Sequence, residues 1–208
     1  MYEVHFRLYL ITDDETAREP DVVAAALGAL PRGLAAVQLR AKGLGGRALL
    51  AAAATLREVT ARHGAPLFIN DRVNVALAVG ADGVHLPVAG LAPEDARAVG
   101  PRLAIGASTH SLAEARAAVE RGAHFVTFGP VWDTPSKARY GDPVGLGRLL
   151  EAAAALPVPV FALGGIDADR AAACAVAGAR VACIRAVLGA DDPGAAALDM
   201  ARHAAWVD

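Results

Sequence analysis

The chain has few cysteines, no block of basic residues and little net charge, and each of these absences excludes a class of protein. Cys174 and Cys183 are its two cysteines, and neither belongs to a CxxC motif or to a cluster of histidines and cysteines. A zinc or redox centre is therefore not expected, and the cysteine usage indicates a reduced, cytoplasmic compartment. The formal net charge of −2 argues against a general nucleic-acid-binding protein.

Long apolar runs and linkers are also missing. No apolar run approaches the roughly 20 residues of a membrane-spanning helix, so no membrane association is expected. The first residues lack the basic region and the small-residue cleavage site of a signal peptide. No low-complexity or linker-like segment divides the chain, and we expect a single domain over residues 1–208.

What the chain does have is abundant alanine and a regular alternation of two kinds of segment. Apolar residues make up 55% of the sequence, and alanine-rich segments are typical of helices. Ser111 with Glu114 predicts a capping box at one helix start, and Asp167 is expected to cap another. The predicted strands cover residues 6–12, 35–41, 65–71, 83–87, 102–109, 124–131, 159–166 and 180–186, and the predicted helices lie near 21–30, 46–63, 72–79, 93–98, 111–121, 146–155, 167–177 and 193–205.

Eight repeats of strand and helix predict a closed barrel. Most of the strand runs are continuously apolar, as in parallel strands that are covered on both faces. Eight such units in a chain of 208 residues favour an α/β fold of the single (β/α)₈ TIM-barrel type. The alternative is an open, doubly wound sheet.

Polar residues follow the predicted strands, at the end of a barrel where active sites are found. Buried polar groups are costly unless they are paired, so a cluster of them at strand ends favours a polar ligand. The residues at these ends are Gln38, Arg40, Lys42, Asn70, Asp71, His85, Pro87, Ser108, Thr109, His110, Gly164, Gly165, Ile184 and Arg185. Alternation along the second strand is expected to point Gln38, Arg40 and Lys42 to the same side.

The segment GPVWDTPSKARYGDPVG, residues 129–145, follows the sixth predicted strand and is expected to grip an anion. Its Thr134, Ser136 and Lys137 supply hydroxyls and positive charge. The glycine pair 164–165 precedes a helix, where backbone N–H groups can approach an anion. Residue types alone thus predict a barrel enzyme that handles a phosphorylated small molecule.

Simpler interpretations of these residues remain open at this point. A glycine pair before a helix is usually just a turn. Asn70 and Asp71 could form a strand-to-helix turn with a cap, and Arg185 could belong to a structural salt bridge.

Several motifs together resemble the thiamine-phosphate synthase/TenI family. They are LYLITDD, VQLRAKG, FINDRVNVAL, ADGVHLP, IGASTHS, GPVWDTPSK and ALGGI, and they cover nearly the whole chain in the family's order. The resemblance implies an enzyme of thiamine biosynthesis, a transferase that joins hydroxymethylpyrimidine diphosphate to thiazole phosphate and releases pyrophosphate. It further implies phosphorylated small molecules as substrates and Mg²⁺ as the cofactor that neutralises the departing diphosphate.

The resemblance also implies a role for each matching residue. Asp71 would be a Mg²⁺ ligand. Gln38, Arg40, Lys42, Asn70, Ser108 and Lys137 would contact the pyrimidine and its diphosphate, whereas Thr134 and Ser136, with the backbone at Gly165, Ile184 and Arg185, would hold the thiazole phosphate.

One departure from the synthase pattern leaves other functions open. Synthases typically have an aspartate, the second metal ligand, five residues after the histidine that corresponds to His85, and here that position is Gly90. The HLP variant is similar to the TenI branch, an isomerase that aromatises thiazole phosphate without metal, with His110 as acid and base. A non-catalytic binder of thiazole or thiamine phosphate is the third interpretation. Related barrels often form dimers, so a homodimer is considered, although no sequence patch identifies an interface.

Overall fold

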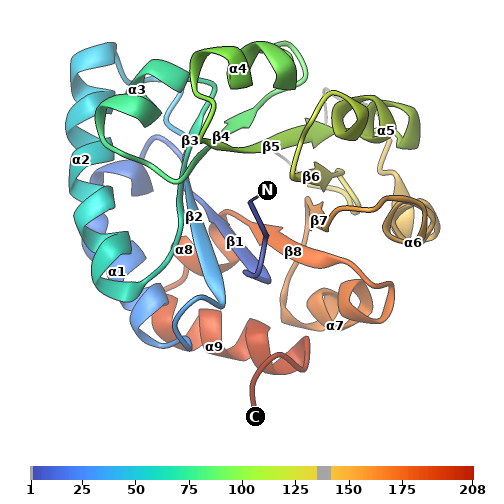
Figure 1. Cartoon of the computed structure of the whole chain (residues 1–208). Coiled ribbons are helices and arrows are strands. Elements are labelled where there is room, and N and C mark those ends of the chain that lie inside the picture. The colour runs from blue at the N-terminus through green and yellow to red at the C-terminus, as the bar shows by residue number, and fades with distance from the viewer. Residues whose placement is uncertain (1, 135–141) are drawn as a thin grey trace.

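The apolar runs of the sequence form the parallel strands of a closed barrel (Figure 1). This computed structural model describes residues 2–134 and 142–208. Each strand pairs in parallel with its neighbours along the chain, and β8 pairs with β1 to close the barrel. The strands are β1 (Leu8–Ile11), β2 (Ala35–Leu39), β3 (Leu67–Asn70), β4 (Gly83–Leu86), β5 (Ala104–Thr109), β6 (Phe125–Phe128), β7 (Val160–Leu163) and β8 (Arg180–Cys183). The predicted (β/α)₈ TIM barrel is therefore confirmed, and the open sheet is excluded.

Helices form an outer ring around the strands (Figure 1). In α2, leucine and valine recur on one face, and Leu49, Leu56 and Val59 are buried as this period predicts. The helices are η1 (Thr16–Arg18), α1 (Pro20–Gly28), α2 (Gly46–His63), α3 (Val73–Ala78), α4 (Pro93–Val99), α5 (Leu112–Glu120), α6 (Gly145–Ala155), α7 (Ala168–Val176), α8 (Arg185–Leu188) and α9 (Pro193–His203). Among the helices of residues 2–134 and 142–208, none has the length and apolar character to span a membrane.

Strand alternation divides the core into two layers. In β1, Leu8 and Leu10 pack outward with the helices, while Tyr9 and Ile11 face the barrel interior. Every residue of β1, β2, β4 and β6 is buried, which is why most residues of these runs are apolar.

The N-terminal end of the barrel is closed by the chain itself. Arg180 lies at the start of β8, and its Nη1 donates hydrogen bonds to the carbonyl oxygens of Val4 (2.8 Å) and Phe6 (2.6 Å). The same guanidinium lies 5.8 Å from the ring centroid of Phe161. The opposite end, at the carboxyl ends of the strands, carries the polar side chains.

Several predicted elements were too long, and two short helices were missed. The strand predicted to reach residue 41 ends at Leu39, so strand alternation cannot align Arg40 and Lys42 with Gln38. The strand predicted to reach residue 186 ends at Cys183, and α8 begins two residues later. Neither η1 nor α8 was predicted, because one turn of helix is too short to carry a periodic pattern.

The predicted helix starts are confirmed with one difference in detail. Asp167 Oδ1 accepts a hydrogen bond from the Arg170 N–H at 2.9 Å, as expected for a cap of α7. Ser111 Oγ accepts from the Glu114 N–H at 3.2 Å. The Glu114 carboxylate, however, accepts from the His110 N–H (2.7 Å) rather than from the Ser111 N–H of a standard capping box.

Candidate functional site

A cavity of about 430 Å³ opens at the carboxyl ends of β7 and β8. It brings together predicted site residues from four separate parts of the chain, because strand ends that are distant in sequence meet at one end of a barrel. The predicted residues on its wall are Arg40, Thr134, Gly165, Ile184 and Arg185. This is the end of a barrel where the loops after strands seven and eight frequently bind phosphate.

The glycine pair after β7 allows two loops to approach closely. Gly164 and Gly165 have φ angles of 103° and 66°, which side chains disfavour. A Cβ atom at position 165 would lie 2.7 Å from the Asp133 carbonyl oxygen and 2.9 Å from Trp132 Cβ. The backbone N–H of Trp132 donates to the Gly164 carbonyl oxygen at 3.2 Å. The pair is therefore more than a simple turn, since it seats the loop after β6 against the cavity wall.

Arg40 is held by its backbone to the loop after β1. The Arg40 N–H donates to Thr12 Oγ1 at 2.9 Å, and that hydroxyl donates to the Arg40 carbonyl oxygen at 3.3 Å. Three residues further on, the Gly43 N–H donates to Asp14 Oδ1 at 2.8 Å. These contacts fix the backbone from which the Arg40 guanidinium reaches the cavity.

Asp13 also lines the cavity and was not among the site residues predicted from the sequence. Partial burial acts to raise the pKa of its carboxyl group, but hydrogen bonds from Thr16 and Glu15 outweigh burial and lower the pKa. A charged carboxylate therefore shares the cavity with Arg40 and Arg185. The motif LYLITDD contains this residue, and its position two residues after the buried strand β1 was the available signal.

A layer of polar side chains fills the barrel interior next to this cavity. The polar layer consists of Tyr9, Gln38, His85, Ser108 and Thr127, which come from five strands. Gln38 Nε2 donates to the Tyr9 hydroxyl at 3.3 Å, and that hydroxyl lies 3.4 Å from His85 Nδ1. His85 Nε2 lies 3.0 Å from Ser108 Oγ and 3.5 Å from Thr127 Oγ1.

His85 is the centre of the polar layer and lies inside the barrel rather than at its rim. It was predicted to lie at the rim with Pro87, but its ring points inward from β4, where the residue is 2% exposed. Burial, together with the nearby positive charge of Arg40, lowers the pKa of His85 to about 3, so the ring is neutral. Leu163 and Ile184 line the cavity and also pack against the interior cluster that contains Tyr9, so the polar layer adjoins the cavity.

Asp71, the predicted metal ligand, lies beside Gly90. Its carboxylate is exposed at the end of β3, and its backbone N–H donates to the His85 carbonyl oxygen at 2.9 Å. A Cβ atom at Gly90 would lie 2.8 Å from Asp71 Oδ1. The position at which synthases have a second aspartate is therefore adjacent to the first carboxylate, although the two residues are 19 positions apart. The capping alternative is not supported, because no side chain of the described residues caps α3.

The side chains around Asp71 fit Mg²⁺ only if phosphate oxygens of the substrate complete its coordination. Within the described ranges, no group of three or more histidine, cysteine, aspartate or glutamate side chains could hold a metal ion. Mg²⁺ is commonly bound by one or two carboxylates together with water and substrate phosphates, so Asp71 alone is compatible with it.

The remaining predicted residues occupy different positions. Asn70 is half-buried at the end of β3, and Lys42 is exposed in the loop after β2. His110 Nδ1 is hydrogen-bonded to the Gly129 carbonyl oxygen at the start of the loop after β6. Ser136 and Lys137 lie outside the residues that the structure describes. In the described part of the chain Arg185 makes no ion pair, so the structural salt bridge considered for it is not supported.

A closed parallel barrel with a cationic cavity after β7 and β8 defines the class of phosphate-binding TIM barrels. The family model described as thiamine monophosphate synthase matches residues 8–187. The chain therefore belongs to this family, and the predicted resemblance is confirmed.

Relatives and solved structures agree with this family. A "Putative thiamine-phosphate synthase" of Geobacter sulfurreducens is 49% identical over 93% of this chain and 92% of that protein. A "Thiamine-phosphate synthase" of Gloeobacter violaceus is 47% identical over 90% of this chain, which spans 54% of that longer protein. The solved thiamine phosphate pyrophosphorylase of Pyrococcus furiosus superposes with a TM-score of 0.87 at 35% identity, over 98% of this chain and 97% of that one. These names favour the synthase over the tautomerase.

More distant structures share the fold alone. A 3-hexulose-6-phosphate synthase superposes with a TM-score of 0.67 at 20% identity, over 95% of this chain and 99% of that one.

Proposed function

We propose that this protein is a thiamine-phosphate synthase, a transferase that couples hydroxymethylpyrimidine diphosphate to thiazole phosphate and releases pyrophosphate. The observation that carries the proposal is the position of the cationic cavity beside the buried polar layer, with Leu163 and Ile184 between them. One part offers positive charge for phosphoryl groups, and the other offers hydrogen-bonding groups for a polar ring. We also infer that residues 1–208 form one domain that works in the cytoplasm. For the oligomeric state we consider a homodimer, which a sedimentation measurement tests.

The chemical step breaks one bond and forms another. The CH₂–O bond of the pyrimidine diphosphate breaks, and its electron pair leaves with the pyrophosphate. The thiazole nitrogen then donates its lone pair to the resulting carbocation and forms the C–N bond. The protein has to stabilise the negative charge of the leaving group and to hold the two rings face to face.

We assign the leaving-group contacts to residues of the polar layer, to residues at the ends of β2 and β3, and, by the family resemblance alone, to Lys137. Arg40, Lys42 and Lys137 supply positive charge, Ser108 and Asn70 supply hydrogen bonds, and Gln38 contacts the pyrimidine. The thiazole phosphate lies in the cavity, between Thr134 and the backbone of Gly165, Ile184 and Arg185. Ser136, which lies outside the described residues, is assigned to the same phosphate by the family resemblance alone. A phosphate ester there would meet glycine backbone and two guanidinium groups, which suits an anion.

We infer that Asp71 holds Mg²⁺ together with substrate phosphate oxygens. Bound in this way, Mg²⁺ would neutralise part of the diphosphate charge. Gly90 leaves Asp71 as the one carboxylate that the family pattern supplies, so we expect the free protein to bind Mg²⁺ weakly.

The direct test supplies the purified protein with both substrates, with and without Mg²⁺. We expect thiamine phosphate and pyrophosphate to appear together and only when Mg²⁺ is present. Product formation is followed by chromatography, and pyrophosphate is measured with a coupled enzyme. The synthase assignment fails if neither product forms at any Mg²⁺ concentration.

A TenI-type tautomerase is the second candidate, and Gly90 is the observation that favours it. The same preparation is given the thiazole phosphate tautomer alone, without metal. Aromatisation that is lost in His110→Ala would support this candidate, because the imidazole suits proton transfer near neutral pH. Binding of thiazole phosphate with neither activity would instead support a non-catalytic binding protein.

A further inference from the structure

The hydrogen bonds of the polar layer form a chain with a defined direction. Tyr9 is fully buried and its hydroxyl oxygen accepts from Gln38 Nε2, so its proton needs an acceptor. Among its described hydrogen-bond contacts, that acceptor is His85 Nδ1. A neutral imidazole carries one proton, and this proton must then lie on Nε2.

This direction determines how Ser108 meets a ligand. With its proton on Nε2, His85 donates to Ser108 Oγ, which lies 3.0 Å away. Because Ser108 Oγ acts as acceptor toward His85, its own O–H is left to donate elsewhere. Ser108 is partly exposed, whereas the rest of the polar layer is buried. A phosphoryl oxygen is a suitable acceptor for the Ser108 O–H.

The barrel is shaped around the His85 ring. A Cβ atom at Gly106 would lie 2.6 Å from His85 Nδ1 and 2.4 Å from Phe125 Cζ, so glycine leaves the space that both rings occupy. The ring centroids of Tyr9 and Phe125 lie 5.6 Å and 5.7 Å from that of His85. Close packing on these sides holds the imidazole in one orientation.

We propose that His85 is a positioning residue of the coupling reaction, which holds Ser108 as a hydrogen-bond donor toward the diphosphate and, through Tyr9, orients the Gln38 amide. This inference rests on the proposed function, because the contacts of Ser108 and Gln38 with the pyrimidine diphosphate are part of it. His85 itself touches no reacting atom and acts through its neighbours.

The kinetic test compares His85→Leu with His85→Gln and Ser108→Ala. We expect His85→Leu to lower kcat/KM for the pyrimidine diphosphate by about ten- to hundredfold, the effect of one hydrogen bond to a charged group. The KM for thiazole phosphate should stay within about twofold. His85→Gln keeps an N–H donor near Ser108 and should recover part of the loss.

A double mutant separates positioning from simple loss of stability. If His85 acts in part through Ser108, the loss of kcat/KM in the double variant His85→Leu/Ser108→Ala should be smaller than the product of the two single losses. Val59→Ala, in the outer layer on α2, serves as the control, because it opens a cavity far from the polar layer. Additive losses in the double variant, or an equal change in both KM values, would overturn the inference.

A spectroscopic measurement tests the same claim without turnover. In protein labelled with ¹⁵N-histidine, His85 should show a protonated Nε2 and an unprotonated Nδ1. The opposite tautomer would overturn the inference. A wild-type protein without synthase turnover would reject the proposed function and this inference with it, whereas turnover with additive losses would reject the inference alone.

Discussion

At the scale of single residues, a glycine rather than an acidic residue occupies position 90, beside the Asp71 carboxylate. Position 90 lies against the Asp71 carboxylate, where a second acidic side chain would crowd the first. Two carboxylates at such a distance repel each other unless a cation lies between them. If Asp71 holds Mg²⁺ as we propose, glycine at position 90 gives up affinity for Mg²⁺ and avoids repulsion between two carboxylates in the metal-free protein.

Gly90→Asp should turn this position into a second metal ligand. We expect half-maximal synthase activity at a roughly tenfold lower Mg²⁺ concentration, because added ligand charge strengthens a carboxylate site. The melting temperature should fall without Mg²⁺ and recover when Mg²⁺ is added. Activity titrations and thermal melts check the two effects.

Gly90→Asn is the matched control for this change. It has the same size but no charge, so it should reproduce the crowding with little of the gain in Mg²⁺ affinity. Equal Mg²⁺ dependence of the aspartate and asparagine variants would show that the loop does not direct residue 90 at the metal.

At the scale of elements, the turn after β7 holds the cavity wall in place. Gly165 lies between β7 and α7 and contacts the loop after β6 through Trp132 and Asp133. Arg170 of α7 reinforces this junction, because its guanidinium lies 5.3 Å from the Trp132 ring centroid and donates to the Gly165 carbonyl oxygen. The sequence predicted a glycine-containing turn here, but it could not show which loop packs against it.

Gly165→Ala should displace that loop and weaken binding of thiazole phosphate. The methyl group meets the Asp133 carbonyl oxygen at 2.7 Å, and φ is 66°, so we expect a loss of about 2–3 kcal/mol of stability. The affinity for thiazole phosphate, measured by calorimetry, should fall at the same time.

Gly33→Ala provides the control for backbone strain alone. Gly33 also has a positive φ, 81°, but a Cβ atom there meets nothing within 4 Å. We expect a loss of about 1 kcal/mol in chemical denaturation and unchanged ligand affinity. If both variants behave alike, the loop contact contributes nothing to the cavity.

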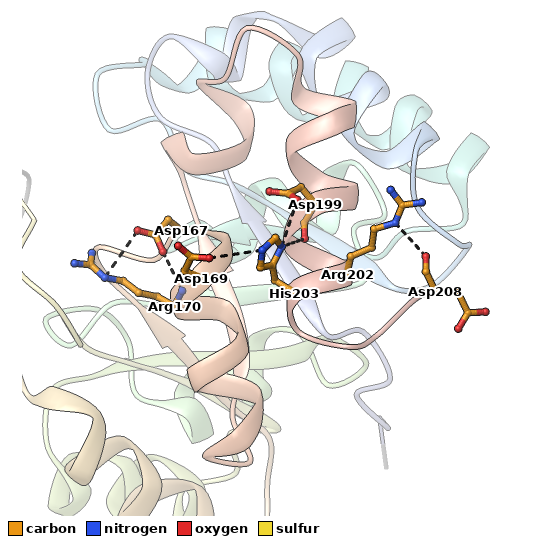
Figure 2. Close-up of polar contacts among 7 residues, drawn as sticks. All are labelled: Asp167, Asp169, Arg170, Asp199, Arg202, His203 and Asp208. Carbon is orange, nitrogen blue, oxygen red and sulfur yellow. Dashed lines mark hydrogen bonds and ion pairs between the residues drawn. The ribbon is translucent and has the colours of Figure 1, made fainter.

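At the scale of the whole molecule, α9 completes the outer ring between α7 and α1. Figure 2 shows His203 of α9 between Asp199 on its own helix and Asp169 on α7. His203 Nδ1 lies 2.9 Å from the Asp199 carbonyl oxygen and 3.3 Å from its Oδ1, and Nε2 lies 3.6 Å from Asp169 Oδ1. The hydrogen bond to the Asp199 carbonyl, aided by both carboxylates, raises the pKa of His203.

This contact should make the stability of the barrel depend on pH. Because the pKa of His203 is higher in the folded protein than in the unfolded chain, its contribution is complete below the unfolded value of about 6.5. The contribution disappears as the pH rises through the folded pKa. His203→Gln should therefore destabilise the protein at about pH 5.5 and have a smaller effect at about pH 9, as measured by chemical denaturation.

Two further variants test the origin of this dependence. Asp169→Asn should remove part of it by weakening the contact between α7 and α9. His5→Gln should leave it unchanged, because the carboxylate near His5 belongs to Glu3 on the same segment. If His203→Gln lowers the free energy of unfolding equally at both pH values, the pH dependence does not come from His203.

The sequence by itself determined the repeating architecture, because local periodicity and capping require only nearby residues. Eight apolar runs, the helical period of α2 and the Asp167 cap were all legible without coordinates. Its motifs also indicated the family. Most of the candidate site residues could be identified as well, since they directly follow the predicted strands.

Only the tertiary structure decided which of these residues meet. Closing the barrel sets the register of eight strands, and this register places Arg40 with Arg185 in one cavity and Gly90 against Asp71. It also turned His85 inward, where Tyr9 and Ser108 give its two nitrogens different partners. These contacts join residues that are 19 to 145 positions apart, and no local pattern in a single sequence encodes such distances.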